Sequence, residues 1–398
     1  MGLNETPSAN RVHIGIFGRR NAGKSSVMNA LTNQSIAIVS DVLGTTTDPV
    51  LKAMELLPIG PVVMIDTPGI DDEGELGALR VKKSYQMLNK TDIAVAVIDG
   101  TEETPEDFAL IDKIRQKNIP LVIFHNKTDV LFNFPKKEGH FYGSALKNIG
   151  ITELKKEIAR LAKTEEPDRK IVGDLLAPLD IAVLVVPIDA AAPKGRLILP
   201  QQQTIRDILE SGGISVVVKE TELAETLKKL GTPPKIVITD SQAFGMVNKI
   251  VPKDILLTSF SILFARYKGN LETAVRGAKA LDGLKDGDKI LISEGCTHHR
   301  QCGDIGTVKL PSWLKKHTSA EVSLNFTSGT EFPDDLSGYS EVIHCGGCML
   351  NEREMKYRYK CAEDQGVPIT NYGIAIAHMH GILKRSVEPF EEIRKILE

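Results

Sequence analysis

Long apolar runs are missing from this chain of 398 residues. None approaches the ~20 apolar residues that a helix needs to cross a bilayer. The first ten residues are polar, and they lack the basic start and apolar middle of a secretion signal. We therefore expect a cytoplasmic protein with no membrane partner.

Aromatic residues and excess charge are also scarce. Only 5% of the residues are Phe, Trp or Tyr, and 49 Lys and Arg stand against 52 Asp and Glu, which gives a net charge of -3. Proteins that bind nucleic acids commonly present a basic face with aromatic residues that stack on bases. The composition therefore gives no reason to expect a nucleic-acid partner.

Cysteine is absent from the first 295 residues, and all five cysteines lie at position 296 or later. Five cysteines in a chain of this length do not form a disulfide framework in a reducing compartment. Their confinement to the C-terminal region instead points to a metal site there.

Short apolar segments alternate with helix-length segments, which predicts an α/β fold with parallel sheets. Strands are expected at residues 12–17, 62–65, 93–98 and 121–125, with helices from residue 24 and near residues 76–88, 105–116 and 152–162. A second set of strands is expected at residues 181–186, 214–218, 236–238 and 255–257. The charged, proline-containing segment 164–170 is the first boundary, and we expect domains over residues 1–168, 169–264 and 265–398.

The first expected strand is followed by G-x-x-x-x-G-K-S, the sequence of a phosphate-binding loop. In such a loop, backbone N–H groups surround phosphate oxygens, Lys24 reaches the β- and γ-phosphates, and the Ser25 hydroxyl binds Mg²⁺. The expected nucleotide contacts in this segment are Gly18, Asn21, Ala22, Gly23, Lys24, Ser25 and Ser26.

Two later segments fit the switch regions of a GTPase. Asp66-Thr-Pro-Gly69 ends a strand, so Asp66 can hold the Mg²⁺ shell and the Gly69 amide can sense a γ-phosphate. Gly44-Thr45-Thr46-Thr47-Asp48 matches the first switch, in which Thr46 is expected to complete the Mg²⁺ coordination next to Thr45.

Two further segments indicate guanine as the base. Asn126-Lys127-Thr128-Asp129 resembles the N-K-x-D motif of GTPases, in which the Asp accepts hydrogen bonds from N1 and N2 of guanine. Ser144-Ala145-Leu146 matches the short backbone motif that supports the guanine O6. The expected ligands are therefore GTP or GDP with Mg²⁺, and the expected reaction is GTP hydrolysis.

Two residues bear on the rate of that reaction. Ile70 follows Gly69 at the position where Ras-type enzymes carry a water-orienting Gln, so intrinsic hydrolysis should be slow. Asn21 resembles the Asn with which GTPases of the TrmE and Era group bind K⁺ near the phosphates, and this resemblance implies stimulation by K⁺. The chain departs from that group at Thr47, where the group usually has Arg.

The cysteines form a metal-binding pattern. Cys296-Thr-His298 follows an expected strand at residues 289–292, and His344-Cys345-Gly-Gly-Cys348 follows one at residues 341–343. The three thiolates and one His would make a tetrahedral zinc site. The same thiolates would hold three irons of a [4Fe–4S] cluster, with a ligand other than Cys on the fourth iron. The spacing does not separate these two alternatives.

The two remaining cysteines are expected to differ from these three. Cys302 could be a reserve ligand, whereas Cys361 falls in an expected helix over residues 351–362, where a small buried hydrophobic residue is the better interpretation.

A GTPase domain with Asn21 in its phosphate loop, followed by C-x-H and a distant H-C-x-x-C, resembles the HydF family of maturation GTPases for iron-only (FeFe) hydrogenases. The resemblance covers essentially the whole chain. It implies a Ras-like GTPase domain of the TrmE/Era group, a middle α/β dimerisation domain and a C-terminal [4Fe–4S] domain. It also implies a homodimeric scaffold or carrier that receives a di-iron precursor from the radical-SAM maturases HydE and HydG. The precursor would pass to the apo-hydrogenase, with GTP turnover timing the exchange of partners.

The resemblance assigns the cluster thiolates to Cys296, Cys345 and Cys348. It leaves the fourth ligand among His298, His344, Asp189 and solvent, and Asp189 would reach the cluster only if the domains pack together. Two other functions remain open: a GTPase with a structural zinc module that assists RNA or ribosome assembly, and a GTPase gated by a redox-sensing cluster.

Overall fold

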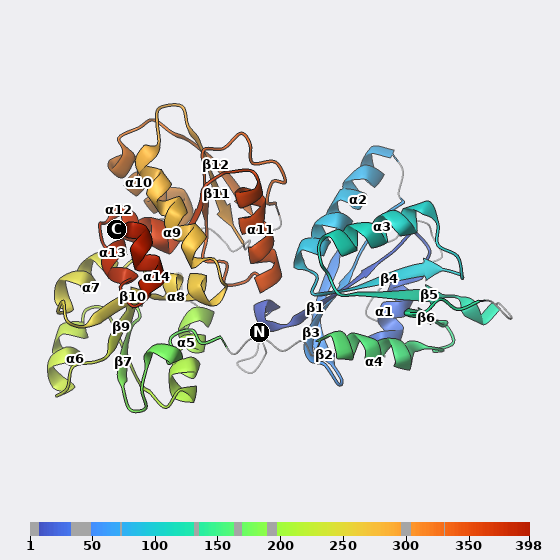
Figure 1. Cartoon of the computed structure of the whole chain (residues 1–398), viewed down its shortest axis with the longest axis horizontal. Helices are drawn as coiled ribbons and strands as arrows, with labels where there is room; N and C mark the ends of the chain where they lie inside the picture. The colour runs from blue at the N-terminus through green and yellow to red at the C-terminus, as the bar shows by residue number, and fades with distance from the viewer. Residues whose placement is uncertain are drawn as a thin grey trace. The chain divides into compact units, whose positions relative to one another are not determined.

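The computed structural model of the chain describes residues 8–32, 49–71, 74–130, 135–162, 169–188, 197–295, 304–329 and 331–398. The chain divides into two compact units, Met1–Glu166 and Pro167–Glu398, which run from blue to green and from green to red in Figure 1. None of the helices in the described ranges combines the length and the apolar character that crossing a membrane requires.

The first unit is a six-stranded sheet in the order β2-β3-β1-β4-β5-β6, in which β2 is antiparallel to β3 and the other neighbours are parallel. The strands are β1 (Val12–Phe17), β2 (Val50–Leu56), β3 (Gly60–Asp66), β4 (Ile93–Asp99), β5 (Leu121–Asn126) and β6 (His140–Tyr142). The helices are α1 (Lys24–Thr32), α2 (Gly74–Met87), α3 (Pro105–Gln116) and α4 (Ile151–Ala162), with short 3₁₀ turns at Ser8–Asn10, Leu88–Lys90 and Thr128–Val130.

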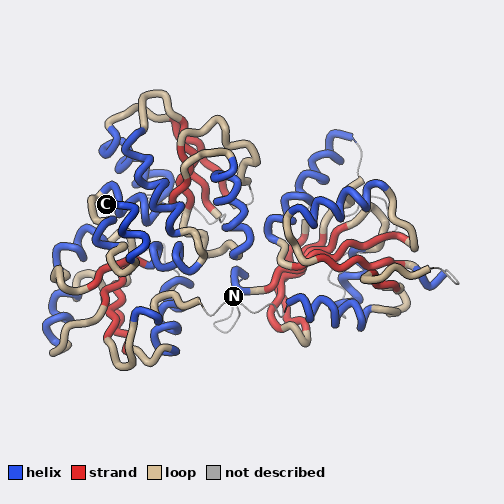
Figure 2. The backbone as a smooth tube through the Cα atoms, viewed as in Figure 1, coloured by secondary structure: helices blue, strands red, loops and turns tan. Residues whose placement is uncertain are grey.

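Both faces of this sheet are buried by helices, as Figure 2 shows. Successive residues of β4 point to opposite faces, so Val95 and Val97 enter one core cluster with α1 and α4, while Ala94 and Ala96 enter another with α3. The nearly continuous apolar sequence of the central strands follows from this burial on two sides. The prediction of an α/β fold with parallel central strands is confirmed.

The second unit contains two parallel sheets, in the orders β10-β9-β7-β8 and β12-β11-β13-β14. The first consists of β7 (Ile181–Val185), β8 (Ile214–Val218), β9 (Ile236–Thr239) and β10 (Leu256–Ser259), with α5 (Leu199–Glu210), α6 (Leu223–Lys229), α7 (Phe244–Ile250) and α8 (Phe260–Tyr267). The second consists of β11 (Lys289–Glu294), β12 (Ser323–Ser328), β13 (Glu341–His344) and β14 (Ile369–Asn371). The remaining helices of the unit are α9 (Leu271–Ala280), α10 (Leu310–Thr318), α11 (Glu352–Asp364), α12 (Tyr372–Met379), α13 (Leu383–Ser386) and α14 (Glu391–Arg394). The unit also has a π-helical turn at Ile305–Lys309 and 3₁₀ turns at Gly173–Leu175, Leu281–Gly283 and Lys395–Leu397.

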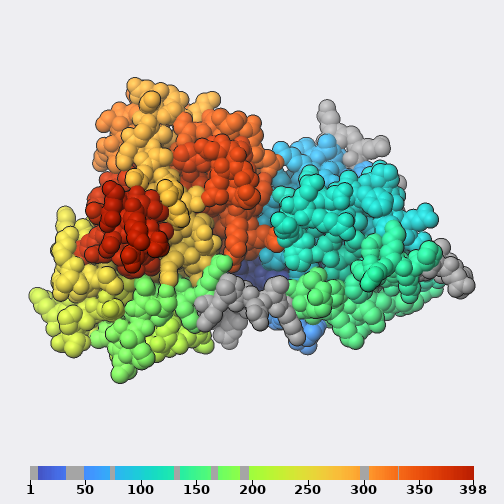
Figure 3. All heavy atoms as spheres, in the orientation of Figure 1, coloured from blue at the N-terminus to red at the C-terminus, as the bar shows by residue number. Residues whose placement is uncertain are grey.

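One hydrophobic core joins the two sheets of this unit. It includes Val183 of β7, Phe264 of α8 and Ile369 of β14, and the yellow and orange-red segments lie against one another in Figure 3. The expected boundary at residue 264 falls inside α8. The division of this unit into a middle and a C-terminal domain therefore stays a prediction.

Candidate functional site

The phosphate-binding loop joins β1 to α1, and its backbone requires glycine at two positions. Gly18 has φ +149°, and a Cβ there would lie 2.3 Å from the Val97 carbonyl oxygen. Gly23 has φ +88°, and a Cβ there would lie 2.2 Å from Nδ2 of Asn126. The Lys24 side chain is buried and donates from Nζ to the carbonyl oxygens of Gly18 (3.0 Å) and Arg19 (2.7 Å). The Lys24 ammonium thus lies against the backbone of the phosphate-binding loop, at the place where a phosphate would bind.

The expected Mg²⁺ ligands lie at the adjacent ends of α1 and β3. Ser25 Oγ donates to Asp66 Oδ2 at 2.7 Å. Asp66 Oδ1 is buried and has no hydrogen-bond partner among the described residues. Burial raises the pKa of Asp66, although the Ser25 hydroxyl and the Lys24 charge oppose that shift. The Ser25 hydroxyl and the Asp66 carboxylate lie within hydrogen-bond distance of each other, and such a pair of oxygen donors suits a hydrated Mg²⁺ ion.

The segment after Asp66 is fastened to the phosphate-binding loop. A Cβ at Gly69 would lie 2.9 Å from the Arg20 amide nitrogen, and that amide donates to Asp71 Oδ1 at 2.5 Å. Ile70 is 8% exposed and belongs to a core cluster, so its side chain cannot orient water. Asn21 is exposed and has φ +60°.

The Asn126 side chain brings the guanine motifs to the phosphate-binding loop. Its Nδ2 donates to the Ala22 carbonyl at 2.9 Å, and its Oδ1 accepts from the Ala145 amide at 2.9 Å. Lys127 has φ +62°, and its Nζ lies 2.8 Å from Asp99 Oδ2. Three segments that are far apart in sequence therefore meet at one amide group.

Asp129 has the properties expected of an acceptor for guanine. Hydrogen bonding from Ser144, and then from Lys147, lowers the pKa of Asp129, so its carboxylate is ionised at neutral pH. Lys147 Nζ lies 3.3 Å from Asp129 Oδ2, whereas Ser144 is buried and Leu146 is 90% exposed. The expected switch residues Thr45 and Thr46 fall in residues 33–48, outside the described residues.

The described cysteines of the second candidate site lie in the loop between β13 and α11. Cys345 Sγ accepts hydrogen bonds from the amides of Gly295 (3.0 Å) and Gly347 (3.4 Å). Burial raises the pKa of the Cys345 and Cys348 thiols. Gly295 directly follows β11, which pairs with β13, so this amide donor to Cys345 comes from the end of the neighbouring strand.

A buried lysine adjoins this cysteine loop. Lys268 is 9% exposed and donates from Nζ to the Gly347 carbonyl at 2.5 Å. Burial lowers the pKa of Lys268, whereas the nearby Cys348 and Cys345 thiolates oppose that shift. Two adjacent thiols, amide donors to sulfur and a neighbouring cation fit a thiolate-bound metal centre, because such a centre carries negative charge that needs compensation.

Both ring nitrogens of His344 make hydrogen bonds within the protein. Its Nδ1 lies 2.6 Å from the Cys345 carbonyl oxygen, and its Nε2 lies 2.9 Å from an Arg358 nitrogen. Because Arg can only donate, Nε2 is the acceptor and Nδ1 carries the proton. Burial, followed by the Arg358 charge, lowers the pKa of His344 to about 3. Both ring nitrogens are occupied, which argues against the expectation that His344 is the fourth cluster ligand.

The other expected ligands are distributed as follows. Cys361 lies on α11 and packs against the core, and its Sγ lies 3.5 Å from the Asp334 carbonyl oxygen. The remaining candidates fall outside the described residues: Asp189, Cys296, His298 and Cys302. Lys268 and Arg358 could not be predicted from the sequence, because no motif marks a buried cation whose partners lie elsewhere in the chain.

Family models match three parts of the chain. Residues 13–127 match a 50S ribosome-binding GTPase model, residues 171–269 match the hydrogen maturase F dimerization domain, and residues 272–389 match the hydrogen maturase F tetramerization domain. The chain belongs to the hydrogen maturase F family. This confirms the expected membership of the HydF family, with a GTPase domain followed by a dimerization domain. The third match is a tetramerization domain, and the expected [4Fe–4S] cluster in that region stays a prediction.

Two curated relatives match a shorter segment of the chain. The tRNA modification GTPase MnmE of Aquifex aeolicus (strain VF5) is 36% identical over 155 residues, which cover 37% of this chain and 34% of that protein. MnmE of Ruthia magnifica subsp. Calyptogena magnifica is 33% identical over 167 residues, covering 40% and 37%. The matches thus span about a third of the length of these relatives. Among solved structures, Aquifex aeolicus Era bound to GDP·AlF4⁻ has a TM-score of 0.35 and 20% identity, covering 55% of this chain and 98% of that chain.

Proposed function

We propose that this hydrogen maturase F chain hydrolyses GTP and serves as a scaffold or carrier in the maturation of FeFe hydrogenase. The observation that carries the proposal is that one chain contains both a GTPase-type nucleotide site and a cysteine loop suited to a metal centre. The first unit assembles a phosphate-binding loop with a guanine motif, and the second unit places a pair of half-buried cysteines next to a buried lysine.

In the first unit, the phosphate-binding loop with Lys24 would bind the GTP phosphates, and Ser25, Thr46 and Asp66 would bind Mg²⁺ and its water shell. The Asp129 carboxylate would accept the N1 and N2 hydrogens of guanine. Because Ile70 is buried at the position of a water-orienting Gln, turnover would be slow. A K⁺ ion held by Asn21 would supply charge beside the phosphates and raise the rate.

In the second unit, Cys296, Cys345 and Cys348 would bind three irons of a [4Fe–4S] cluster. Such a cluster offers a fourth iron whose oxygen or nitrogen ligand exchanges more easily than a thiolate. With both nitrogens of His344 occupied, the candidates for that ligand are His298, Asp189 and solvent. Lys268 would offset part of the negative charge of the cluster.

The cargo would be a di-iron precursor delivered by HydE and HydG and passed to the apo-hydrogenase. Self-association of the chain is supported by the two matched models, which are named for dimerization and tetramerization. An assembly larger than the expected dimer is therefore part of the proposal.

Anaerobic purification tests the cluster against zinc. The proposal predicts a coloured protein with about four irons and four sulfides per chain, able to support maturation of apo-hydrogenase in the presence of HydE and HydG. A colourless protein that holds zinc and still matures hydrogenase would refute it. The alternative of a zinc module for RNA or ribosome assembly is not favoured, because the hydrogen maturase models cover the unit that carries the cysteines.

A further inference from the structure

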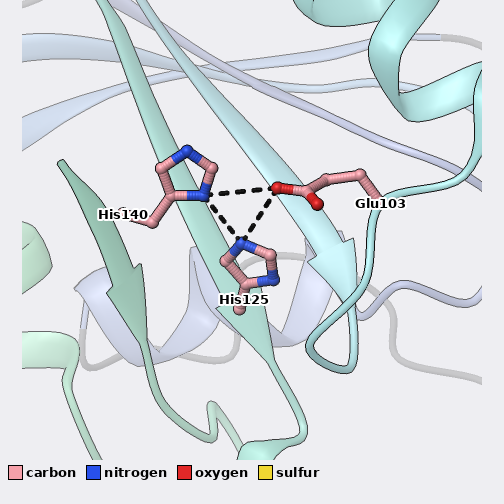
Figure 4. Close-up of side chains that lie close together, drawn as sticks. All are labelled: Glu103, His125 and His140. Carbon is pink, nitrogen blue, oxygen red and sulfur yellow. Dashed lines mark hydrogen bonds and ion pairs between the residues drawn. The ribbon is translucent and has the colours of Figure 1, made fainter. Parts of the chain in front are cut away.

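Two histidines and a glutamate lie close together in the first unit, outside the expected nucleotide contacts (Figure 4). Both residue types are common ligands of metal ions. Glu103 comes from the loop between β4 and α3, His125 from the end of β5, and His140 from the start of β6. Their side chains are 3%, 0% and 16% exposed, respectively. The fold therefore buries two imidazoles and a carboxylate against one another.

Their donor atoms are spaced as the ligands of a tetrahedral ion would be. His125 Nε2 lies 3.0 Å from His140 Nδ1 and 3.6 Å from Glu103 Oε1, and His140 Nδ1 lies 3.4 Å from Glu103 Oε1. Ligands about 2.0–2.1 Å from a tetrahedral Zn²⁺ are roughly 3.3 Å apart. An ion slightly above the plane of these three atoms would therefore reach all of them at bonding distance.

The surrounding contacts orient the three donor atoms, His125 Nε2, His140 Nδ1 and Glu103 Oε1, toward one another. His125 Nδ1 faces the Gly100 carbonyl at 3.0 Å, which places the ring proton there and leaves the Nε2 lone pair toward His140 and Glu103. The Tyr142 ring stacks on His125 with centroids 4.5 Å apart. Lys137 pairs with Glu103 Oε2, so Oε1 is the carboxylate oxygen directed at the two imidazoles.

The charge state of the three groups also suits a cation. Burial lowers the pKa of His125 and of His140, so both rings are neutral at neutral pH. Burial alone would raise the pKa of Glu103, but the hydrogen bond from Lys137, a backbone hydrogen bond and the Lys137 charge together outweigh burial, and the net effect is a lowered pKa. Neutral imidazole and ionised carboxylate are the forms that bind metals.

We propose that Glu103, His125 and His140 form a site for a divalent transition-metal ion of the Zn²⁺ type, with one coordination position left to water. Two imidazoles and one carboxylate suit Zn²⁺ and related first-row ions better than Mg²⁺ or Ca²⁺, which prefer oxygen ligands. The site is distinct from the cysteine site, since its ligands all belong to the first unit.

A metal ion here would join three segments beside the guanine motif. His125 directly precedes Asn126, the Gly143 amide donates to the His125 carbonyl at 2.9 Å, and the Gly100 amide donates to the Asn126 carbonyl at 3.0 Å. Because an ion that binds the folded protein more tightly than the unfolded chain stabilises the fold, the first unit should unfold at a higher temperature when it is loaded.

The test uses the full chain with all five cysteines changed to Ser (Cys296, Cys302, Cys345, Cys348 and Cys361), which removes every competing thiolate. This protein should bind one equivalent of Zn²⁺ in the first unit and unfold at a higher temperature with Zn²⁺ than with a chelator. With Co²⁺ it should show ligand-field bands without the intense charge-transfer absorption of thiolate ligands. His140→Ala and Glu103→Gln, added singly, should each weaken Zn²⁺ binding at least tenfold and remove the thermal shift.

His317→Ala is the matched control, because His317, His378 and Asp282 form the other cluster of this kind among the described residues. There, both imidazoles contact the same oxygen of an Asp282 side chain that is 57% exposed. This control should keep the bound equivalent. The proposal is overturned if the parent protein binds no Zn²⁺, if both ligand variants bind it unchanged, or if only the His317 variant loses it. Retained GDP binding by the variants shows that the first unit is folded.

Discussion

The Asn126 side chain connects the two ends of the nucleotide site. A single amide group accepts a hydrogen bond from Ala145, in the segment expected to face guanine, and donates one to Ala22 in the phosphate-binding loop. Gly23 is the residue that makes room for it, because a Cβ there would overlap Nδ2 of Asn126. The segments expected to contact the base and the phosphates therefore share one arrangement of the backbone.

Asp129→Asn should lower the preference for GTP over ATP by about ten- to a hundredfold, since hydrogen bonds to a charged group contribute roughly 1.5–3 kcal/mol. The amide of Asn can donate to the additional carbonyl of xanthine, so the variant should bind xanthosine nucleotides better than the parent does. Competition binding against a fluorescent GDP analogue measures both effects. An unchanged ratio of GTP to ATP affinity would show that Asp129 does not contact the base.

Asn21→Ala should remove the difference between K⁺ and Na⁺ in the rate of GTP hydrolysis, whereas the parent should be severalfold faster in K⁺. The rates are compared at fixed ionic strength, with release of phosphate as the readout. Lys24→Ala is the control for loss of the phosphate contact, and its rate should fall about a hundredfold or more in either salt. Equal rates of the parent in both salts would refute the role of Asn21.

At the residue scale, the residues of the phosphate-binding loop were predictable, because a loop that surrounds a phosphate group requires a fixed spacing of Gly, Lys and Ser. The partners of His344 and the place of Lys268 were not predictable. Lys268 and Gly347 are separated by 79 positions, and nothing in either local sequence indicates the contact. The contact at Nε2 of His344 likewise depends on Arg358, a buried residue of α11 that lies 14 positions away in the sequence.

Among the elements, the sequence predicted the strands that are buried on both faces. It missed β2, which is mostly exposed and antiparallel, and β12, which is polar and partly exposed. It also missed β6 and β14, which have three residues each and are too short to show a period. The helices at Pro105–Gln116 and Ile151–Ala162 were predictable to within one residue, because their apolar positions repeat with helical spacing.

The contact between α9 and β14 gives a prediction about stability. A Cβ at Gly277 would lie 2.2 Å from the Ile369 carbonyl oxygen, so Gly277→Ala should push the helix from the strand and destabilise the second unit by about 1–3 kcal/mol. Gly245→Ala is the matched control, because Gly245 lies in α7 with open space around it. That change should leave stability unchanged or raise it by up to about 1 kcal/mol. Denaturant unfolding of both variants measures the difference, and equal stabilities would contradict the close packing.

For the whole molecule, the two candidate sites belong to units with separate hydrophobic cores. The expected nucleotide contacts come from the first unit, and Cys345, Cys348 and Lys268 come from the second. Damage to the cysteine loop should therefore leave the phosphate-binding loop folded. This separation allows one activity to serve as an internal control for the other.

The most direct test of the central claim is the iron content of anaerobically prepared Cys345→Ser protein, measured with its GTP hydrolysis and its ability to mature apo-hydrogenase. We predict loss or degradation of the cluster and of maturation, with GTP hydrolysis largely retained, while the control Cys361→Ser keeps all three. A four-iron cluster that survives Cys345→Ser with full maturation would contradict the account.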